Sequence, residues 1–314
     1  MKPPRVLEIG QIISATRLCL FLFLLHFQEQ AFSQADPLSL DSIVAESVPV
    51  KHAFNGSYII NNQSSNVQEC GSLNFLILHR FGELSDGAYN AYGLDYAAIR
   101  LGFEYGISDR LTAAIGRSSM GKNYDGHLKY RLKTQTIDGP NNFPISLVIF
   151  TSAAFSSVEL QRQNSVQNDN QFVNQLVYTS ELIISRQFSE KFSFEIIPAI
   201  VHRNSVDSPT YSQNVYALSA GGRFKISGRM HLMADYSYVI NNDDNTLTNP
   251  LALGIDIVTG GHTFQVYATN SVGMIEKEFL TATTGKIQDG NIRIGFTISR
   301  AFMLKRKIKG GKLN

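Results

Sequence analysis

Apolar and polar residues alternate one by one along most of this chain, and that period constrains the fold more than any other feature. In the stretch NIRIGFTISRAF (291–302), Ile292, Ile294 and Phe296 alternate with polar or small residues such as Arg293. Successive side chains of an extended strand point to opposite faces, so this period gives a strand one apolar and one polar face. Because such runs recur from about residue 72 to the C-terminal region, the sequence predicts an all-β protein.

The same alternation predicts twelve strands, and the connections between them alternate between short and long. The predicted strands span residues 72–82, 96–107, 110–119, 124–136, 143–155, 172–188, 191–203, 213–227, 229–240, 250–258, 262–271 and 290–302. The short connections are rich in Gly, Ser and Asp, which suit tight turns, and lie at 106–110, 136–144, 188–192, 226–230 and 258–262. Short turns on one end and long loops on the other are typical of an outer-membrane barrel, with the turns facing the periplasm. We therefore predict a closed, antiparallel transmembrane β-barrel of about twelve strands.

A soluble β-sandwich is the alternative, since its strands alternate in the same way. Two features favour the barrel. Many predicted strands have ten or more residues, whereas the usual length is about five or six. Their apolar faces are also flanked by aromatic residues, as at Phe192, Phe194 and Ile196, and lipid covers such a face without a second sheet. The segment 48–62 fits a further strand, a periplasmic extension or an inward plug.

The N-terminal region has the pattern of a secretory signal. Arg17 precedes the apolar run 18–25, and the small residues Ala31 and Ser33 follow at cleavage-site spacing. A membrane anchor is the alternative, but about ten apolar residues are too few to cross a hydrocarbon core of roughly 30 Å. We expect cleavage before Gln34, export, and residence in the outer membrane of a Gram-negative bacterium.

These features divide the chain into four expected parts. They are a signal peptide (1–33), an N-terminal periplasmic or plug segment (34–70), the barrel (71–303) and a basic tail (304–314). After cleavage only Cys70 remains, which excludes an internal disulfide framework and a cysteine-based metal site. The net charge of +2 argues against a nucleic-acid partner.

One stretch nearly matches a phosphate-binding loop. In GRSSMGKN, Gly116, Gly121 and Lys122 occupy the P-loop positions, but Asn123 stands where Ser or Thr should bind magnesium. A P-loop also leads from a strand into a helix, whereas YDGHLKYRL, which follows here, alternates like a strand. We predict a hairpin that binds no nucleotide.

The histidines offer no clear catalytic or metal site. They are scattered, with no pair four residues apart and no H-E-x-x-H. A lipid hydrolase of the outer-membrane kind would need Ser and His on the outer wall; His202 and His262, at strand ends, leave that open as a remote alternative. No G-x-S-x-G supports it. We expect no enzyme activity, no metal and no cofactor.

If the apolar faces meet lipid, the opposite faces line the lumen and carry the charged residues. The predicted lumen-lining residues are Arg80, Arg100, Glu104, His127, Lys129, Arg131, Lys133, Glu181, Glu195, Arg223, Lys225, His231, Asp235, Asp256 and Arg293. That set has eight Lys or Arg residues against five Asp or Glu residues, so the predicted lumen leans basic.

Four of these residues lie on one predicted strand, at every second position. His127, Lys129, Arg131 and Lys133 would form a ladder that attracts anions, as basic rings do in anion pores. The alternative is a structural wall in which carboxylates pair with the basic groups. The leading functional hypothesis is a passive channel or small-solute transport protein, with small anions as candidate solutes, in contact with outer-membrane lipid. The alternative function is a structural or binding barrel with a plugged lumen that serves an unidentified protein partner.

Part of the chain also resembles a known family. The stretches HRFG (79–82), GLDYAAIRLGFEYGISDRLTAAIGRSS (93–119) and YDGHLKYRL (124–132) resemble a family of Bacteroidota β-barrel proteins of unknown function. The resemblance extends through most of the chain after the signal, and its most distinctive sequence stretches lie in the first third. It implies an outer-membrane-type barrel and a Gram-negative source, and it brings no catalytic residues.

Overall fold

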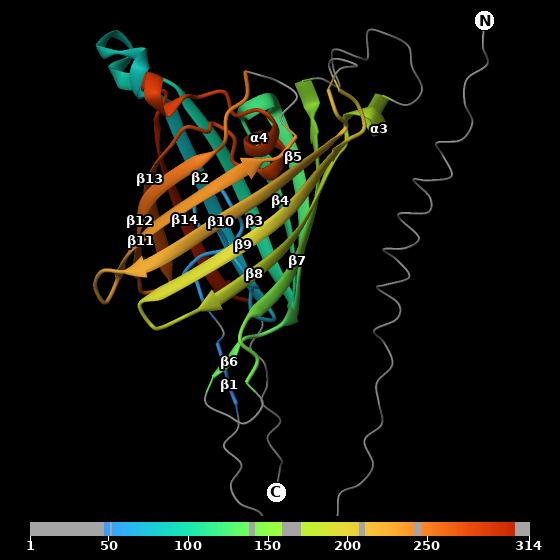
Figure 1. Cartoon of the computed structure of the whole chain (residues 1–314), viewed down its shortest axis with the longest axis vertical. Helices are drawn as coiled ribbons and strands as arrows, with labels where there is room; N and C mark the ends of the chain where they lie inside the picture. Colours follow the sequence, from blue (N-terminus) through green and yellow to red (C-terminus); the bar gives the residue numbers. More distant parts are fainter. Residues whose placement is uncertain are drawn as a thin grey trace, which may run out of the picture. The chain divides into compact units, whose positions relative to one another are not determined.

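The computed structural model of the chain describes residues 47–50, 52–137, 142–158, 171–206, 211–241 and 246–304 (Figure 1). Twelve of its strands form one closed antiparallel barrel. They are β2 (Ser72–Glu83), β3 (Ala97–Ser108), β4 (Leu111–Ser118), β5 (Asn123–Lys133), β7 (Ser146–Ser156), β8 (Val177–Gln187), β9 (Phe192–Arg203), β10 (Asn214–Lys225), β11 (Met230–Val239), β12 (Leu251–Thr259), β13 (His262–Thr269) and β14 (Arg293–Met303). The predicted fold class and the predicted number of barrel strands are confirmed.

Each barrel strand pairs with the next barrel strand along the chain, and the first and last strands close the barrel. β14 pairs with β2 from Arg293↔Glu83 to Met303↔Ser72. Every predicted strand corresponds to an observed one. The largest difference is at β8, which begins at Val177 because the short helix α3 (Gln171–Gln175) takes the preceding residues.

The two faces of the barrel wall have opposite chemistry. Along β11, burial alternates at every residue: Leu232 and Tyr236 are exposed on the outer face, whereas His231 and Asp235 are buried on the inner face. Apolar outer residues and polar inner residues are the arrangement that a barrel in lipid requires. None of the described helices is long and apolar enough to cross a membrane.

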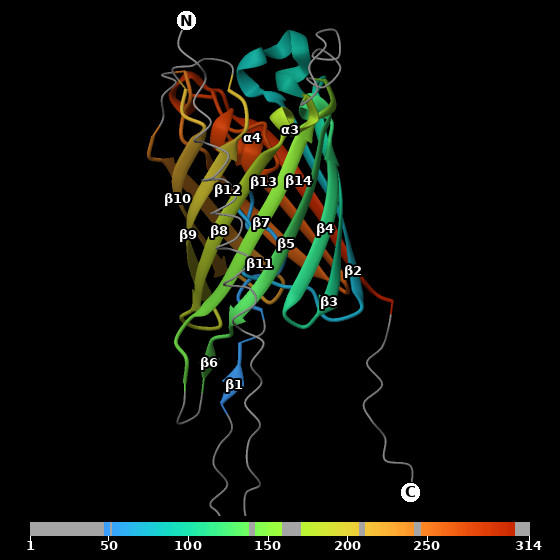
Figure 2. The ribbon, with the colours of Figure 1, turned by 90° about the vertical axis from the view of Figure 1, so that its right-hand side faces the viewer.

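The two ends of the barrel differ as the spacing predicts (Figure 2). At one end, here called the turn end, the connections are short; Gly260 and Gly261 join β12 to β13 with φ values of 23° and 105°. At the other, here called the loop end, the connections are long and carry α3, α4 (Glu276–Thr281) and the 3-10 helices η1 (Leu84–Asp86), η2 (Ala88–Gly93), η3 (Met120–Lys122) and η4 (Ile287–Asp289). In outer-membrane barrels the short turns face the periplasm.

The segment before β2 divides into two parts. β1 (Val48–Pro49) pairs with β6 (Thr136–Ile137) in a small separate sheet beyond the turn end (Figures 1 and 2). Residues 53–67 then run inside the barrel, where most of them are buried. Of the three interpretations of segment 48–62, the structure therefore shows an inward plug, with a short pairing outside the barrel at its start.

The near-match to a phosphate-binding loop connects two barrel strands. β4 ends at Ser118, η3 follows, and β5 begins at Asn123. Gly121 (φ 55°) and Lys122 (φ 45°) have left-handed backbone, which reverses the chain. The helix that a phosphate-binding loop requires is not there: a strand follows.

The position of a charge on the outer wall should decide its effect on stability. Leu101, halfway along β3, is 46% exposed on the outer face, and Ile107, near the turn end of the same face, is 50% exposed. We expect Leu101→Arg to lower the free energy of unfolding in lipid vesicles by about 2–4 kcal/mol and Ile107→Arg by about 0–1 kcal/mol, since the cost falls with distance from the bilayer centre. Urea titrations measure both free energies of unfolding, with the folded fraction determined from the shifted gel migration of the folded barrel. Equal losses at the two positions would contradict a lipid-facing wall.

Candidate functional site

The lumen of the barrel is the candidate site, and a folded-back loop occupies it. This loop, residues 53–68, is here called the plug. Its two limbs are joined by backbone hydrogen bonds, from Ser64 N to Ser57 O (2.8 Å) and from Ile59 N to Asn62 O (2.9 Å). The sequence NGSYIINNQSSN (55–66) favours such a reversal, because Asn, Ser and Gly readily form turns.

The plug enters and leaves the barrel at the turn end. Before it, Val50 N donates to Gln135 O (2.8 Å), and after it, Gly71 N donates to Gly106 O (2.8 Å). Only the tip, around Asn61, reaches deep into the lumen. The chain therefore does not thread through the barrel.

Asp235 on β11 holds the tip of the plug. Its carboxylate accepts hydrogen bonds from three consecutive backbone N–H groups, those of Ile60 (3.0 Å), Asn61 (2.7 Å) and Asn62 (3.1 Å). The Asn61 side-chain amide donates to the other oxygen (3.0 Å). Hydrogen bonds to a charged acceptor are about twice as strong as neutral ones, so Asp235 is a principal anchor.

Lys129 on β5 holds the two limbs together. Its ammonium donates to Ser57 O (2.9 Å) on one limb and to Ser64 O (3.1 Å) on the other. Glu195 on β9 accepts from the backbone N–H of Ser65 (3.2 Å). These inward charges therefore satisfy the peptide groups of the plug, which would otherwise be buried without partners.

Near the turn end, a third anchor involves Asn55. Its amide nitrogen donates to both oxygens of Asp256 (2.8 and 2.9 Å), and its amide oxygen accepts from Arg223 (2.5 Å). His231 lies against the same carboxylate, with its Nδ1 at 2.8 Å from Asp256 Oδ1. Three wall residues thus fix one plug side chain.

The loop end is closed by a second element, the connection between β13 and β14 that carries α4. Phe279 and Leu280 of α4 are buried against inward apolar residues of β8–β11, such as Val201 and Val215. The two closures also meet. Gln63 Nε2 of the plug donates to Glu276 Oε1 of α4 (2.8 Å).

Arg80 on β2 bonds to both closures. One terminal nitrogen donates to Asn61 Oδ1 of the plug (2.8 Å), and the other donates to the backbone oxygens of Ser271 (3.1 Å) and Gly273. Arg80 is fully buried. Its guanidinium therefore joins the wall, the plug and the loop-end connection at one point.

The structure buries eleven of the residues in the predicted lumen set. Arg80, Arg100, Glu104, His127, Lys129, Glu181, Glu195, Arg223, Asp235 and Asp256 are buried on the inner face, with His231 beside them. Arg131, Lys225 and Arg293 are only half-buried, and Arg293 forms an ion pair with Glu83 (2.6 Å) at the loop end of its strand.

The predicted basic ladder is not a continuous row. A β-bulge between Arg131 and Lys133 shifts the register of β5 against β7. Lys133 is consequently exposed instead of lining the lumen, with its ammonium 5.1 Å from the ring centroid of Phe143. His127 lies 3.7 Å from Glu104, and Lys129 bonds to the plug. Neither His127 nor Lys129 therefore faces an open passage.

The sequence interpretation missed one inward carboxylate, and it offered the plug only as one of three possibilities, without its contacts. Asp125 pairs with Arg100 on the wall (2.5 Å), and extending the alternation of β5 back by one inward position identifies it. With Asp125 included, the buried strand residues number four Lys or Arg against six Asp or Glu. On the buried inner face acidic residues therefore outnumber basic ones, whereas in the predicted set basic residues outnumber acidic ones. The plug has no periodic pattern that could have revealed its contacts.

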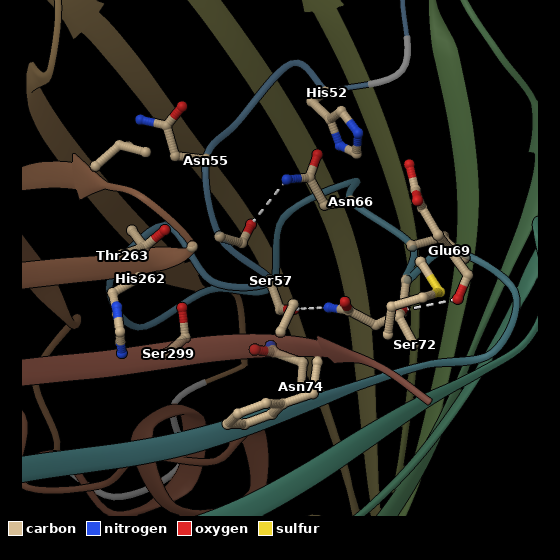
Figure 3. Close-up of a pocket in the computed structure, with 18 residues that line it drawn as sticks. His52, Asn55, Ser57, Asn66, Glu69, Ser72, Asn74, His262, Thr263 and Ser299 are labelled. Atoms are coloured by element: carbon tan, nitrogen blue, oxygen red, sulfur yellow. Dashed lines mark hydrogen bonds between the residues drawn. The ribbon is translucent and has the colours of Figure 1, made fainter. Parts of the chain in front are cut away.

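Two cavities of the described structure lie at the mouths of the barrel. A cavity of about 370 Å³ opens between the plug and the wall at the turn end (Figure 3). A second, of about 630 Å³, lies beside α4 at the loop end. Within the described part of the chain, no three His, Cys, Asp or Glu side chains are placed to hold a metal ion.

The family of the chain follows from its sequence match. Residues 54–302 match the family described as "Membrane bound beta barrel domain (DUF5777)". The chain belongs to this family of membrane-bound β-barrels, and the match spans both the plug and the barrel. No curated protein matches it.

Several solved structures are similar to the chain at a distance. The NanC porin is 13% identical, with a TM-score of 0.47, and the alignment covers 73% of this chain and 98% of that one. The KdgM porin is 9% identical, with a TM-score of 0.42, covering 74% and 99%. An outer-membrane channel of Pseudomonas putida F1 is 12% identical, with a TM-score of 0.42, covering 75% and 97%.

Asp235 provides a direct test of how the plug is held. We expect Asp235→Ala to weaken docking of the plug by about 3 kcal/mol, or about a hundredfold, because it leaves three buried N–H groups without an acceptor. Hydrogen exchange of the amides at 60–66 measures this. Asp235→Asn, which keeps one acceptor oxygen, should have a smaller effect, and Ser219→Ala, which removes only a bond between β10 and β11, should have none. Unchanged exchange in Asp235→Ala would contradict the anchor.

The docking of α4 should depend on pH. Burial raises the pKa of Glu276 from 4.5 to about 6. Docked α4 therefore binds more protons than released α4, and docking should weaken by about 2 kcal/mol as the pH rises from 4.5 through 6. Glu276→Gln keeps an acceptor for Gln63 and should reduce this pH dependence. Hydrogen exchange of the backbone amides of residues 274–282, corrected for the intrinsic exchange rate at each pH, measures this pH dependence. An equal pH dependence in both proteins would contradict the assignment.

Proposed function

We propose that this protein is an outer-membrane channel in its closed state, and that the plug is its gate. The described lumen is filled by the plug from one end and by α4 from the other, so a permanently open passage does not fit the geometry. The choice lies between a removable plug and a permanent one.

The single observation that carries the proposal is the path of the plug. It enters and leaves at the turn end, so it can withdraw as one loop without breaking any pairing between barrel strands. A permanent filling that had to thread through the barrel would not have this freedom.

The chemistry of the interface favours the same interpretation. The buried plug residues are mixed: the polar Ser57, Gln63, Ser64, Ser65 and Asn66 lie beside the apolar Phe54, Tyr58, Ile59 and Ile60. Withdrawal exchanges the hydrogen bonds of the polar residues for bonds to water, and the net value of each is only about 0.5–1.5 kcal/mol. A mainly apolar contact would favour a permanent core instead, because exposing it to water costs roughly 25 cal/mol per Å².

The proposal places the protein in the outer membrane of a Gram-negative bacterium, after export with a cleaved signal peptide. Outer-membrane lipid contacts the apolar outer face. The turn end, with β1 and β6, then faces the periplasm, which is the side from which the plug can be withdrawn.

Selectivity of the open state follows from the wall. Once the plug leaves, six inward carboxylates and four inward Lys or Arg residues remain on the buried strand positions. Lys129 and Arg80 lose their bonds to the plug, but they remain outnumbered. We therefore expect a weak preference for cations in the open channel, in place of the anion preference that the sequence suggested.

A disulfide can lock the plug to the wall. Ser65 Oγ of the plug and Ser185 Oγ of β8 are 2.7 Å apart, so Ser65→Cys with Ser185→Cys, in a Cys70→Ser background, places two thiols together. In planar bilayers the unlocked barrel should open reversibly in urea below its unfolding concentration. The oxidised pair should stay closed and a reductant should restore opening.

The matched control is a disulfide that does not reach the plug covalently. Ser219→Cys with Ser237→Cys links β10 to β11, where the hydroxyls are also 2.7 Å apart. It removes one hydrogen bond from Ser237 to Asn62 of the plug but adds no covalent link to the plug, so it should leave opening intact. A variant without residues 53–66 also loses the plug's bond to α4, so α4 should open as well and the variant should conduct continuously, with a reversal potential in a KCl gradient that shows weak cation selectivity. A folded, heat-modifiable deletion variant without conductance would exclude the channel and favour a structural or binding barrel.

A further inference from the structure

The turn-end cavity is built jointly by the plug and by four neighbouring wall strands, β12, β13, β14 and β2. Figure 3 shows Asn55, Ser57 and Asn66 of the plug on one side, with Thr263 of β13, Ser299 of β14 and Asn74 of β2 nearby. Its volume of about 370 Å³ lies in the range of about 300–1,000 Å³ that small-molecule sites occupy. Half of this site disappears when the plug leaves.

The wall side presents two hydroxyl groups without protein partners. Thr263 and Ser299 are direct cross-strand neighbours, and both are nine-tenths buried or more on the inner face. Neither hydroxyl makes a hydrogen bond with another described residue. Buried hydroxyls are normally bonded, so this pair is available to a solute that carries its own donors and acceptors.

The plug side presents an amide in a fixed orientation. The Asn66 amide nitrogen donates to the backbone oxygens of Phe54 (2.6 Å) and Gly56 (3.1 Å). Its amide oxygen is buried without a partner. Asn55, at the same cavity, is fixed by Asp256 and Arg223, so this face is preorganised.

The charge of the lining excludes a site built for ions. Its 18 residues include no Lys or Arg, one carboxylate (Glu69) and two imidazoles (His52 and His262). The basic residues that the sequence offered for anions are engaged elsewhere, with Lys129 on the plug and Arg100 on Asp125. Val67 and Val258 add apolar surface to the amides and hydroxyls, which suits the C–H faces of a sugar ring.

We infer that the turn-end cavity binds a small, uncharged, polyhydroxylated solute of the saccharide type, and binds it only while the plug is docked. Such a solute stabilises the closed state by linkage, since it binds one state and not the other. Only the role of this solute binding in transport rests on the proposed channel function. Binding itself requires only that the plug is docked.

The experiment measures solute binding to the locked, closed barrel. Absence of binding can therefore be distinguished from a failure of the plug to act as a gate. The probes are glucose, glucuronate and glucosamine, which share a ring and differ in charge, together with maltose. Saturation-transfer NMR on the oxidised Ser65→Cys/Ser185→Cys protein reports binding. Hydrogen exchange of 53–68 in the unlocked protein reports linkage. We expect glucose and maltose to bind, the two charged sugars to bind less, and glucose to slow exchange of the plug.

Two variants localise the site. Thr263→Val and Ser299→Ala should each weaken binding about fivefold, the effect of one hydrogen bond. Thr179→Val is the matched control, because Thr179 is an inward, buried hydroxyl on β8 that does not line this cavity; it should leave binding unchanged. Tighter binding of either charged sugar, equal losses in all three variants, or no binding of any probe to the folded locked barrel would overturn the inference.

Discussion

The interior of this barrel depends on one requirement, that buried polar groups find hydrogen-bond partners. Lipid outside forces apolar residues outward, so the alternation of each strand sends polar residues inward. A narrow lumen lined in that way needs either water or a polar filling. The plug supplies the filling, and the wall in turn satisfies its backbone: Asp235 accepts from three consecutive N–H groups, and Lys129 donates to two carbonyls.

The apolar residues of the plug are accommodated at particular places. Ile59 and Ile60 pack with Met233 and Tyr267 in one cluster, and a Cβ at Gly221 of β10 would overlap the end of Ile59. The wall is therefore shaped for this loop. Shape fixes where the plug sits, whereas the surrounding hydrogen bonds, which water can replace, leave it removable.

The strands could be predicted from the sequence because their signal is local. Period-two alternation identified all twelve, and it also placed Glu104, Glu181 and Asp235 on the inner face. The same rule failed at Lys133, where a bulge adds one residue and reverses the phase. A bulge depends on the partner strand and leaves no mark on the alternation itself.

The sequence could offer a plug only as one alternative, and it could not predict the placement of the plug or of α4, since both depend on contacts between residues far apart in the chain. Asn61 meets Asp235 across 174 positions, and Gln63 meets Glu276 across 213. A run rich in Asn and Ser predicts turns but not a location. The balance of buried charges could not be predicted for a related reason: composition counted basic residues on the strands, whereas the structure shows that several of them contact the plug or lie at the rims.

The two closures of the lumen stabilise each other, and the contacts between them decide how the barrel opens. Arg80 donates to the plug and to the loop-end connection, while Gln63 of the plug donates to α4. Loss of one closure leaves a buried guanidinium with fewer acceptors, which is costly in a low-dielectric interior. Withdrawal of the plug therefore also weakens the docking of α4 on the opposite side of the membrane. In the proposed channel, a change at the turn end is in this way coupled to the loop end.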